Sequence, residues 1–198
     1  MLLQAGGFFL GEVKEVRYKE KIKMDNVMSE IIMREKKRIV LVAHDNMKKE
    51  LLEWALFNKD NLAKHELFAT GSTGKIMVRA LELPVNCFKS GPLGGDQQIG
   101  AKIAEGEIDM VIFFWDPLEP HPHDVDVKAL LRIAAVYNIP IACNRASADF
   151  IISSPLMNDE YERIVVDYEI TQSTRNAMFA QEDELQNDRQ PADTLQQE

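Results

Sequence analysis

Met110-Val-Ile-Phe-Phe-Trp115 is the stretch of sequence that decides the fold. This unbroken apolar run is typical of a strand buried on both faces, as in a parallel sheet that carries helices on either side. Similar apolar runs predict four further strands, at residues 39–43, 67–69, 85–88 and 139–143. Residues 164–166 indicate a sixth strand at an edge.

Segments with the apolar spacing of helices lie between these runs, at residues 48–57, 76–83, 97–105 and 127–137. Because strands and helices alternate along the chain, the sequence predicts an α/β fold. We expect a three-layer αβα sandwich around a doubly wound, mostly parallel five-stranded sheet, with Phe114 and Trp115 in its core.

Composition divides the 198 residues into three predicted parts. Residues 38–170 carry the strand and helix patterns of the globular domain. Residues 1–37 form a charged N-terminal extension, partly helical over residues 24–37 or disordered, and Met24 and Met28 are alternative starts of translation. Residues 171–198 end in an acidic tail with too few apolar residues to fold, so we expect that tail to be disordered.

The overall charge and the cysteines limit the class of protein. A net charge of −9 argues against broad nucleic-acid binding. No apolar stretch has the length of a membrane helix, and the first residues lack the pattern of a signal peptide. Cys87 and Cys143 lie in apolar runs, so we expect two small buried thiols in a reducing compartment. These features predict a cytoplasmic protein without nucleic-acid or membrane partners.

Polar residues follow every predicted strand of the sheet. They are His44-Asp45, Thr70-Gly-Ser-Thr-Gly74, the loop 90–96, the segment 116–126, and Asn144. The carboxyl ends of parallel strands meet at one edge of a sheet, where α/β proteins bind their ligands. The sequence therefore predicts an active site at that edge.

The loop Ser90-Gly-Pro-Leu-Gly-Gly-Asp96 is the most informative of these segments. Glycines let the backbone approach a ligand and leave N–H groups that bind an anion. A carboxylate beside an anion site is electrostatically unfavourable for binding. Proton chemistry explains its presence better than binding alone. Asp96 is therefore a candidate acid or base.

The other segments each allow two interpretations. Thr70 is either a helix cap or part of a phosphate site at a helix N-terminus. Gly74-Lys75-Ile76 does not meet the spacing of a nucleotide-binding P-loop. Lys48 lies one helical turn after His44 and is either a solvated surface lysine or part of the site.

His121 and His123, with Asp124 and Asp126, allow a metal cluster, but the spacing of potential ligands is not that of a tight site. The alternative, which we favour, is that the surrounding prolines hold one imidazole firmly. Asp45, Asp116 and Asp126 are then either surface acids or groups that orient the histidines.

These motifs together resemble the methylglyoxal synthase family, from about Arg38 to about Tyr168. The motifs that carry the resemblance are Val42-Ala-His-Asp45 with Lys48, Ala69-Thr-Gly-Ser-Thr-Gly74, Ser90-Gly-Pro-Leu-Gly-Gly-Asp-Gln-Gln98, Phe113-Phe-Trp-Asp-Pro-Leu118, Pro122-His-Asp124 with Asp126, and Ala148-Asp-Phe-Ile-Ile152. The resemblance implies a flavodoxin-like three-layer sandwich. It also implies a carbon–oxygen lyase that converts dihydroxyacetone phosphate to methylglyoxal and inorganic phosphate.

The resemblance also implies residue roles. Asp96 corresponds to the acid/base that removes a carbon-bound proton, and His123 to the imidazole that binds the enediolate oxygens. Asp45, Asp116 and Asp126 correspond to acids in or near the pocket. The implied substrate- and phosphate-binding residues are His44, Lys48, Thr70, Gly71, Ser72, Thr73, Ser90, Gly91 and His123.

The resemblance further implies no cofactor, no metal, inhibition by inorganic phosphate and a homohexamer. Arg132 and Arg175 are candidates for subunit contacts. Two other classes stay open: an effector-binding domain of the same fold, which would lack Asp96 and the His123 loop, and a metal-dependent hydrolase that uses His121 and His123.

Overall fold

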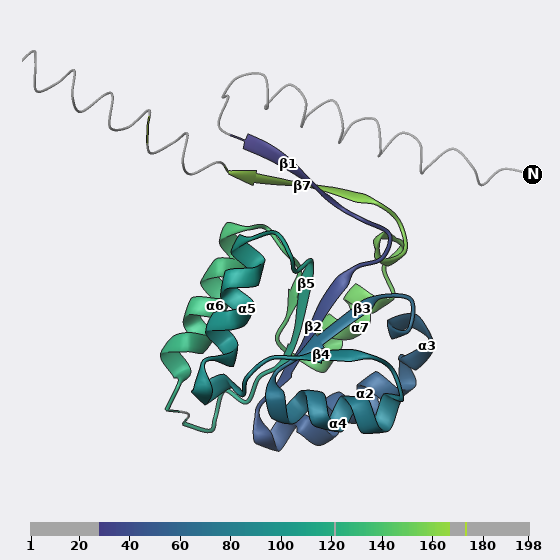
Figure 1. Cartoon of the computed structure of the whole chain (residues 1–198), viewed down its shortest axis with the longest axis vertical. Helices are drawn as coiled ribbons and strands as arrows, with labels where there is room; N and C mark the ends of the chain where they lie inside the picture. Colours follow the sequence, from purple (N-terminus) through teal and green to yellow (C-terminus); the bar gives the residue numbers. More distant parts are fainter. Residues whose placement is uncertain (1–27, 121, 167–172, 174–198) are drawn as a thin grey trace, which may run out of the picture. The chain divides into compact units, whose positions relative to one another are not determined.

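A computed structural model describes residues 28–120, 122–166 and 173, and residues 30–165 belong to the unit that carries the main sheet (Figure 1). Residues 1–29 and 166–198 form a second unit. Its described residues are Met28, Ser29, Val166 and Ser173. The predicted division at residues 37 and 170 stays a prediction. None of the described helices is long and apolar enough to cross a membrane.

The centre of the fold is a five-stranded parallel sheet in the order β4-β3-β2-β5-β6. Its strands are β2 (Arg38–Ala43), β3 (Glu66–Ala69), β4 (Val85–Cys87), β5 (Met110–Phe114) and β6 (Ile141–Ala142). The predicted strand at 139–143 is shorter in the structure, and its start shifts to Ile141 because Pro140 has no N–H to donate to the ladder. The central pair aligns Leu41 with Ile112.

Helices cover both faces of this sheet, which makes three layers (Figure 1). They are α2 (Lys48–Phe57), α3 (Lys59–Leu62), α4 (Gly71–Leu81), α5 (Gly95–Ala104), α6 (Asp124–Val136) and α7 (Arg145–Ile152). Short 3-10 turns are η1 (Asp45–Met47), η2 (Gly91–Leu93) and η3 (Pro155–Met157). Four of the predicted helices are confirmed, α2 with the predicted ends and α4, α5 and α6 with shifted ends, whereas α3 and α7 were not predicted.

Alternate side chains of β2 enter two separate cores. Ile39 and Leu41 pack with residues of α2, α4 and α7, whereas Val40 and Val42 pack with residues of α5 and α6. A strand that is apolar on both faces requires a helix layer on each side, which is why the continuous apolar runs predicted the sandwich. Phe114 is fully buried as expected, while Trp115 is half-buried against the second core.

The doubly wound three-layer sandwich is therefore confirmed. Counted along the chain, the strands of the sheet lie in the order 3-2-1-4-5, and flavodoxin itself has the order 2-1-3-4-5. The likeness to flavodoxin thus lies in the layers. The chain reverses direction across the sheet between β2 and β5, so the ligand crevice is expected at their carboxyl ends.

Two predictions at the margins of the domain are wrong. Residues 161–166 (β7, Tyr161–Val166) do not extend the main sheet but pair with β1 (Met28–Met33) in a separate two-stranded sheet. Residues 28–33, predicted as helical, are therefore a strand. The cause is a pairing between segments far apart in sequence, which local apolar spacing does not reveal; residues 24–27 lie outside the described part.

The prediction for the cysteines is also incorrect in part. Cys87 is exposed and Cys143 is half-buried, and both are free thiols. Cys87 ends the edge strand β4, which has no neighbouring strand on its outer side among the described residues. Burial raises the pKa of the Cys143 thiol.

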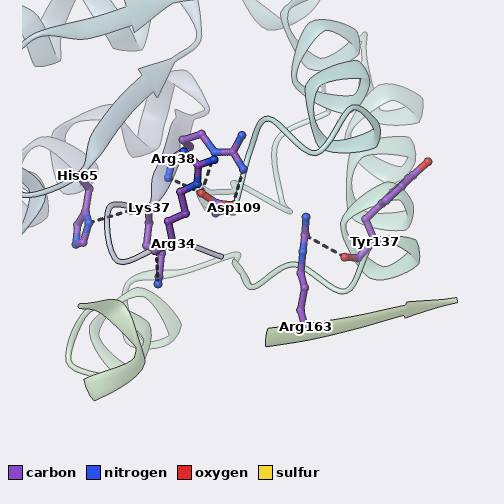
Figure 2. Close-up of polar contacts among 7 residues, drawn as sticks. All are labelled: Arg34, Lys37, Arg38, His65, Asp109, Tyr137 and Arg163. Atoms are coloured by element: carbon purple, nitrogen blue, oxygen red, sulfur yellow. Dashed lines mark hydrogen bonds and ion pairs between the residues drawn. The ribbon is translucent and has the colours of Figure 1, made fainter. Parts of the chain in front are cut away.

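The amino-terminal ends of the central strands carry a polar network on the edge opposite the crevice (Figure 2). The Arg38 side chain donates two hydrogen bonds to the Asp109 carboxylate, from Nη2 to Oδ1 at 2.8 Å and from Nε to Oδ2 at 3.0 Å. Lys37 is buried, and its ammonium binds the carbonyls of Arg34 and Asp159. Burial lowers the pKa of Lys37, although the neighbouring acids oppose that shift.

Arg163 and His65 complete this edge. Arg163 is fully buried and donates to the Tyr137 carbonyl at 3.0 Å, while its Nε and Nη2 have no partner in the described part of the chain. Burial lowers the pKa of the Arg163 guanidinium, and the nearby Arg38 adds to that effect while Asp109 opposes it. His65 is buried, and its Nδ1 accepts from the Lys37 N–H at 3.3 Å.

We expect His65→Gln to reduce the loss of stability in mild acid. Burial, and the positive charges of Lys37, Lys64 and Lys36, lower the pKa of His65 below its ordinary value. Below about pH 6.5 the unfolded chain therefore takes up a proton that the folded state resists, so the free energy of unfolding falls as pH drops. Glutamine keeps an acceptor for the Lys37 N–H and does not titrate.

Urea unfolding at pH 7.5 and pH 5.5 measures this difference. The free energy of unfolding of the His65→Gln variant should fall less between the two pH values than that of the parent. Equal losses in both proteins would contradict the assignment to His65.

Candidate active site

A cavity of about 240 Å³ opens at the carboxyl ends of β2, β3, β4 and β5. Its position is the crevice that the reversal of strand order predicts. It is lined by eight of the residues that the sequence predicted: His44, Asp45, Thr70, Ser72, Ser90, Gly91, Asp96 and His123. Separate loops thus bring hydroxyls, carboxylates and imidazoles to one place.

Asp96 and His123 form the central polar contact of the cavity. The Nδ1 atom of His123 lies 2.9 Å from Oδ2 of Asp96, and both side chains are largely buried. An ionised carboxylate accepts hydrogen bonds only, so with Asp96 ionised His123 donates from Nδ1. The pair is a short path for a proton between a carboxylate and an imidazole.

The start of α5 places Asp96 in this contact. Gly94 has φ 95°, in the left-handed region that glycine adopts without strain, and it turns the chain into α5. Asp96 then lies in the first helical turn, where the helix dipole stabilises a negative charge. A Cβ atom built on Gly91 would lie 3.0 Å from Oδ2 of Asp96 and 3.0 Å from Cε1 of His123. Glycine at 91 therefore leaves open the space beside the pair.

His44 faces the same cavity from the end of β2. Its Nδ1 accepts the backbone N–H of Asp116 at 3.2 Å, so in a neutral ring the proton is on Nε2. The ring contacts Phe113 edge-on, with 5.1 Å between centroids, and lies 5.7 Å from the ring of His123. These contacts hold the imidazole in one orientation.

The N-terminus of α4 supplies the part of the site suited to an anion. Thr70 makes no capping hydrogen bond; its hydroxyl lies 3.4 Å from that of Thr73, and both residues are buried. The Gly71 N–H donates to the Lys89 carbonyl at 3.1 Å. A helix leaves its first N–H groups without partners within the helix, which makes its N-terminus an anion site.

Five predicted residues do not line this cavity: Lys48, Gly71, Thr73, Asp116 and Asp126. Lys48 forms an ion pair with Asp45, which does line it. Asp116 accepts from the Asn46 side chain at 3.0 Å and from the Leu118 N–H at 3.2 Å, and it contacts the site through its N–H to His44. Asp126 lines a second cavity of about 230 Å³ between α5 and α6, which Asp96 also borders.

The alternative of a metal cluster rests on His121, which lies outside the described residues. Within residues 28–120, 122–166 and 173, there is no group of three or more His, Cys, Asp or Glu side chains that could hold a metal ion. His123 is engaged by Asp96 instead.

Several residues of the cavity wall were not predicted: Val42, Ala43, Pro92, Phe113 and Pro122. Val42 and Phe113 belong to strands that the sequence assigned to the core, and their side chains also reach the end of the sheet. Polar residues that follow them closely in sequence, His44 after Val42 and Asp116 after Phe113, could have indicated that these strand residues reach the cavity.

Fold and site define an α/β protein with a carboxylate–imidazole pair next to a helix N-terminus, which is suited to acid–base chemistry on a small anion. Residues 50–143 match the MGS-like domain family. The chain is 58% identical over 141 residues to the methylglyoxal synthase of Leptospira interrogans, covering 71% of this chain and 95% of that protein. It is 63% identical over 134 residues to that of Saccharophagus degradans, covering 68% and 87%.

A solved structure agrees with these relatives. The crystal structure of methylglyoxal synthase from Elizabethkingia anophelis is similar with a TM-score of 0.68 and 51% identity, over 71% of this chain and 92% of that one. The chain therefore belongs to the methylglyoxal synthase family, and it is a lyase.

We expect Gly95→Ala to impair both stability and activity. A Cβ atom at position 95 would lie 2.9 Å from the Ser90 carbonyl carbon and would also clash with the Lys89 carbonyl oxygen. Because these are backbone atoms, the loop that follows β4 must move. The melting temperature should fall by several degrees, as for a loss of about 1–3 kcal/mol from overpacking.

Gly100→Ala in the same helix is the matched control. A Cβ atom at position 100 meets nothing within 4 Å, so alanine should leave stability unchanged or raise it by about 0.5–1 kcal/mol. A Gly95→Ala protein as stable as the Gly100→Ala protein would contradict the close approach.

Proposed function

We propose that this protein converts dihydroxyacetone phosphate to methylglyoxal and inorganic phosphate in the cavity at the carboxyl ends of β2–β5. The observation that carries the proposal is the 2.9 Å contact between Asp96 and His123, beside a glycine and next to the N-terminus of α4. The names of the relatives support the same reaction.

In the first step, Asp96 removes a proton from the hydroxymethyl carbon next to the substrate carbonyl. The electron pair of the broken C–H bond moves into an enediolate. A carboxylate base works on such a weak acid only if the developing oxyanion is stabilised. We assign this role to His123, which contacts Asp96 through Nδ1 and donates a hydrogen bond to the enediolate oxygens from Nε2 when both ring nitrogens carry a proton.

In the second step, the enediolate electrons expel phosphate as its C–O bond breaks, and Asp96 returns the proton it took to the departing phosphate. The three-carbon product leaves as an enol and takes up a proton at its terminal carbon to become methylglyoxal. Elimination requires the C–O bond to stand roughly perpendicular to the enediolate plane, so fixing the phosphate is part of catalysis. No cofactor enters this sequence.

The phosphate-binding roles fall on two loops and one lysine. We assign them to Lys48, Thr70, Gly71, Ser72, Thr73, Ser90 and Gly91. His44 binds the substrate oxygens, with its tautomer set by the Asp116 N–H. Asp45 orients Lys48 through their ion pair. Asp116 and Asp126 act at the border of the site.

Assembly, inhibition and location are further parts of the proposal. We propose a homohexamer that acts in the cytoplasm and is inhibited by its product, inorganic phosphate. Arg132 is an exposed residue of α6 and is a candidate for a subunit contact; Arg175, the other candidate, lies outside the described residues.

We expect the protein to release methylglyoxal and phosphate from dihydroxyacetone phosphate in the presence of EDTA, and Asp96→Asn to abolish this. Removing a general base costs about 10²–10⁴-fold in turnover. Asparagine keeps the shape of the side chain, so binding of inorganic phosphate, measured by calorimetry, should be nearly unchanged. If EDTA abolishes the activity of the parent protein, the metal-dependent hydrolase is favoured instead.

Asp124→Asn is the matched control, because Asp124 is an exposed acid that directly follows His123. This variant should keep full activity. Full activity of the Asp96→Asn protein would exclude Asp96 as the base, and phosphate binding without any turnover in the parent protein would favour the effector-binding domain.

We expect His123→Ala to lower turnover by about 10²–10³-fold, as for the loss of one oxyanion donor. The Michaelis constant should change much less, because the phosphate loops stay intact. Steady-state kinetics separate the two parameters. A variant whose only defect is a higher Michaelis constant would contradict the role of His123 in the transition state.

A further inference from the structure

The peptide group between Lys89 and Ser90 lies at the meeting point of three segments of the site. Gly71, at the start of α4, donates its N–H to the Lys89 carbonyl at 3.1 Å. A Cβ atom on Gly71 would lie 3.1 Å from the Ser90 nitrogen, and one on Gly95 would lie 3.0 Å from the Lys89 carbonyl carbon. The starts of α4 and α5 thus both approach this peptide at backbone distance.

The N–H of Lys89 lies just beyond the last hydrogen bond of the sheet. The preceding residue, Phe88, donates its N–H to the Ala69 carbonyl at 2.8 Å. Lys89 lies two residues beyond the end of the edge strand β4 (Val85–Cys87), where the chain leaves the sheet. Its N–H donates to Oε1 of Gln98 at 2.8 Å. Gln98 therefore supplies the acceptor for the first N–H beyond the sheet.

We propose that Gln98 is a positioning residue for the reaction. Gln98 lies in α5, two residues after Asp96, and its side chain joins that helix to the base of the loop that carries Ser90 and Gly91. It would thereby fix the carboxylate of Asp96 relative to the phosphate-binding loop. This inference rests on the proposed function of Asp96.

The other hydrogen bonds near this loop do not perform the same task. The Ser90 carbonyl accepts from Leu93 at 2.9 Å and from Gly95 at 3.0 Å, so these bonds close the loop on itself. The Lys89–Gly71 bond joins the loop to α4. In the described part of the chain, only the hydrogen bond that the Lys89 N–H donates to Gln98 joins the strand end to a side chain of α5.

We expect Gln98→Leu to lower kcat about tenfold, with KM within about threefold of the parent, because small misplacements of a reacting group reduce rates strongly. The melting temperature should hardly change, since one exposed hydrogen bond contributes little to stability. Gln98→Glu keeps an acceptor at the same reach and should recover most of kcat. Gln98→Asn is one methylene shorter and should resemble Gln98→Leu.

Asn86→Leu is the matched control. Asn86 lies in β4, and its exposed amide donates to Glu66 at 3.3 Å, away from the loop. Removing this hydrogen bond with the same kind of substitution should leave kcat unchanged. A loss as large as that of Gln98→Leu would overturn the specific role of Gln98.

Amide hydrogen exchange at Lys89 gives a readout that does not depend on activity. Protection of the Lys89 N–H should fall about tenfold or more in Gln98→Leu and should be kept in Gln98→Glu. If the Lys89 N–H loses protection in Gln98→Leu while kcat stays unchanged, the proposal is overturned. It is also overturned if the protection of this N–H does not change. A parent protein that makes no methylglyoxal would instead refute the proposed function and leave the exchange result intact.

Discussion

The parallel pairing of β2 with β5 is the constraint on which the rest of this structure depends. Both strands are buried on their two faces, so each must be covered by helices above and below. The chain winds outward from β2 in one direction and from β5 in the other. The loops that leave the two strands therefore diverge, and the space between them is the cavity that holds His44 and His123.

Close backbone approach is the second constraint, and it explains the glycines. Gly71 and Gly95 contact the peptide between Lys89 and Ser90, while Gly91 leaves space next to Asp96 and His123. A side chain at any of the three positions would separate the segments or fill the site. The loop can therefore combine the proposed anion site with a carboxylate, because the helix N-termini supply a positive electrostatic potential that favours both negative charges.

Local sequence patterns predicted the main sheet because its strands are unbroken apolar runs and its helices have regular apolar spacing. They predicted eight residues of the cavity wall because polar residues follow those runs directly, as His44 follows Ala43. They did not predict the pairing of β1 with β7, which joins segments at opposite ends of the domain, nor the exposure of Cys87 on an edge strand. An apolar neighbourhood in sequence does not show which strand lies outermost.

The sequence by itself determined the α/β class and the edge of the sheet at which the polar residues proposed for the site gather, since these follow from periodicity and residue chemistry. Only the tertiary structure decided which groups meet. It joined Asp96 to His123 although they lie 27 residues apart, set the tautomer of His44 through Asp116, and left Asp126 in a neighbouring cavity. The physical reason is that a hydrogen bond requires atoms about 3 Å apart, and strand order, which no local pattern encodes, sets that distance.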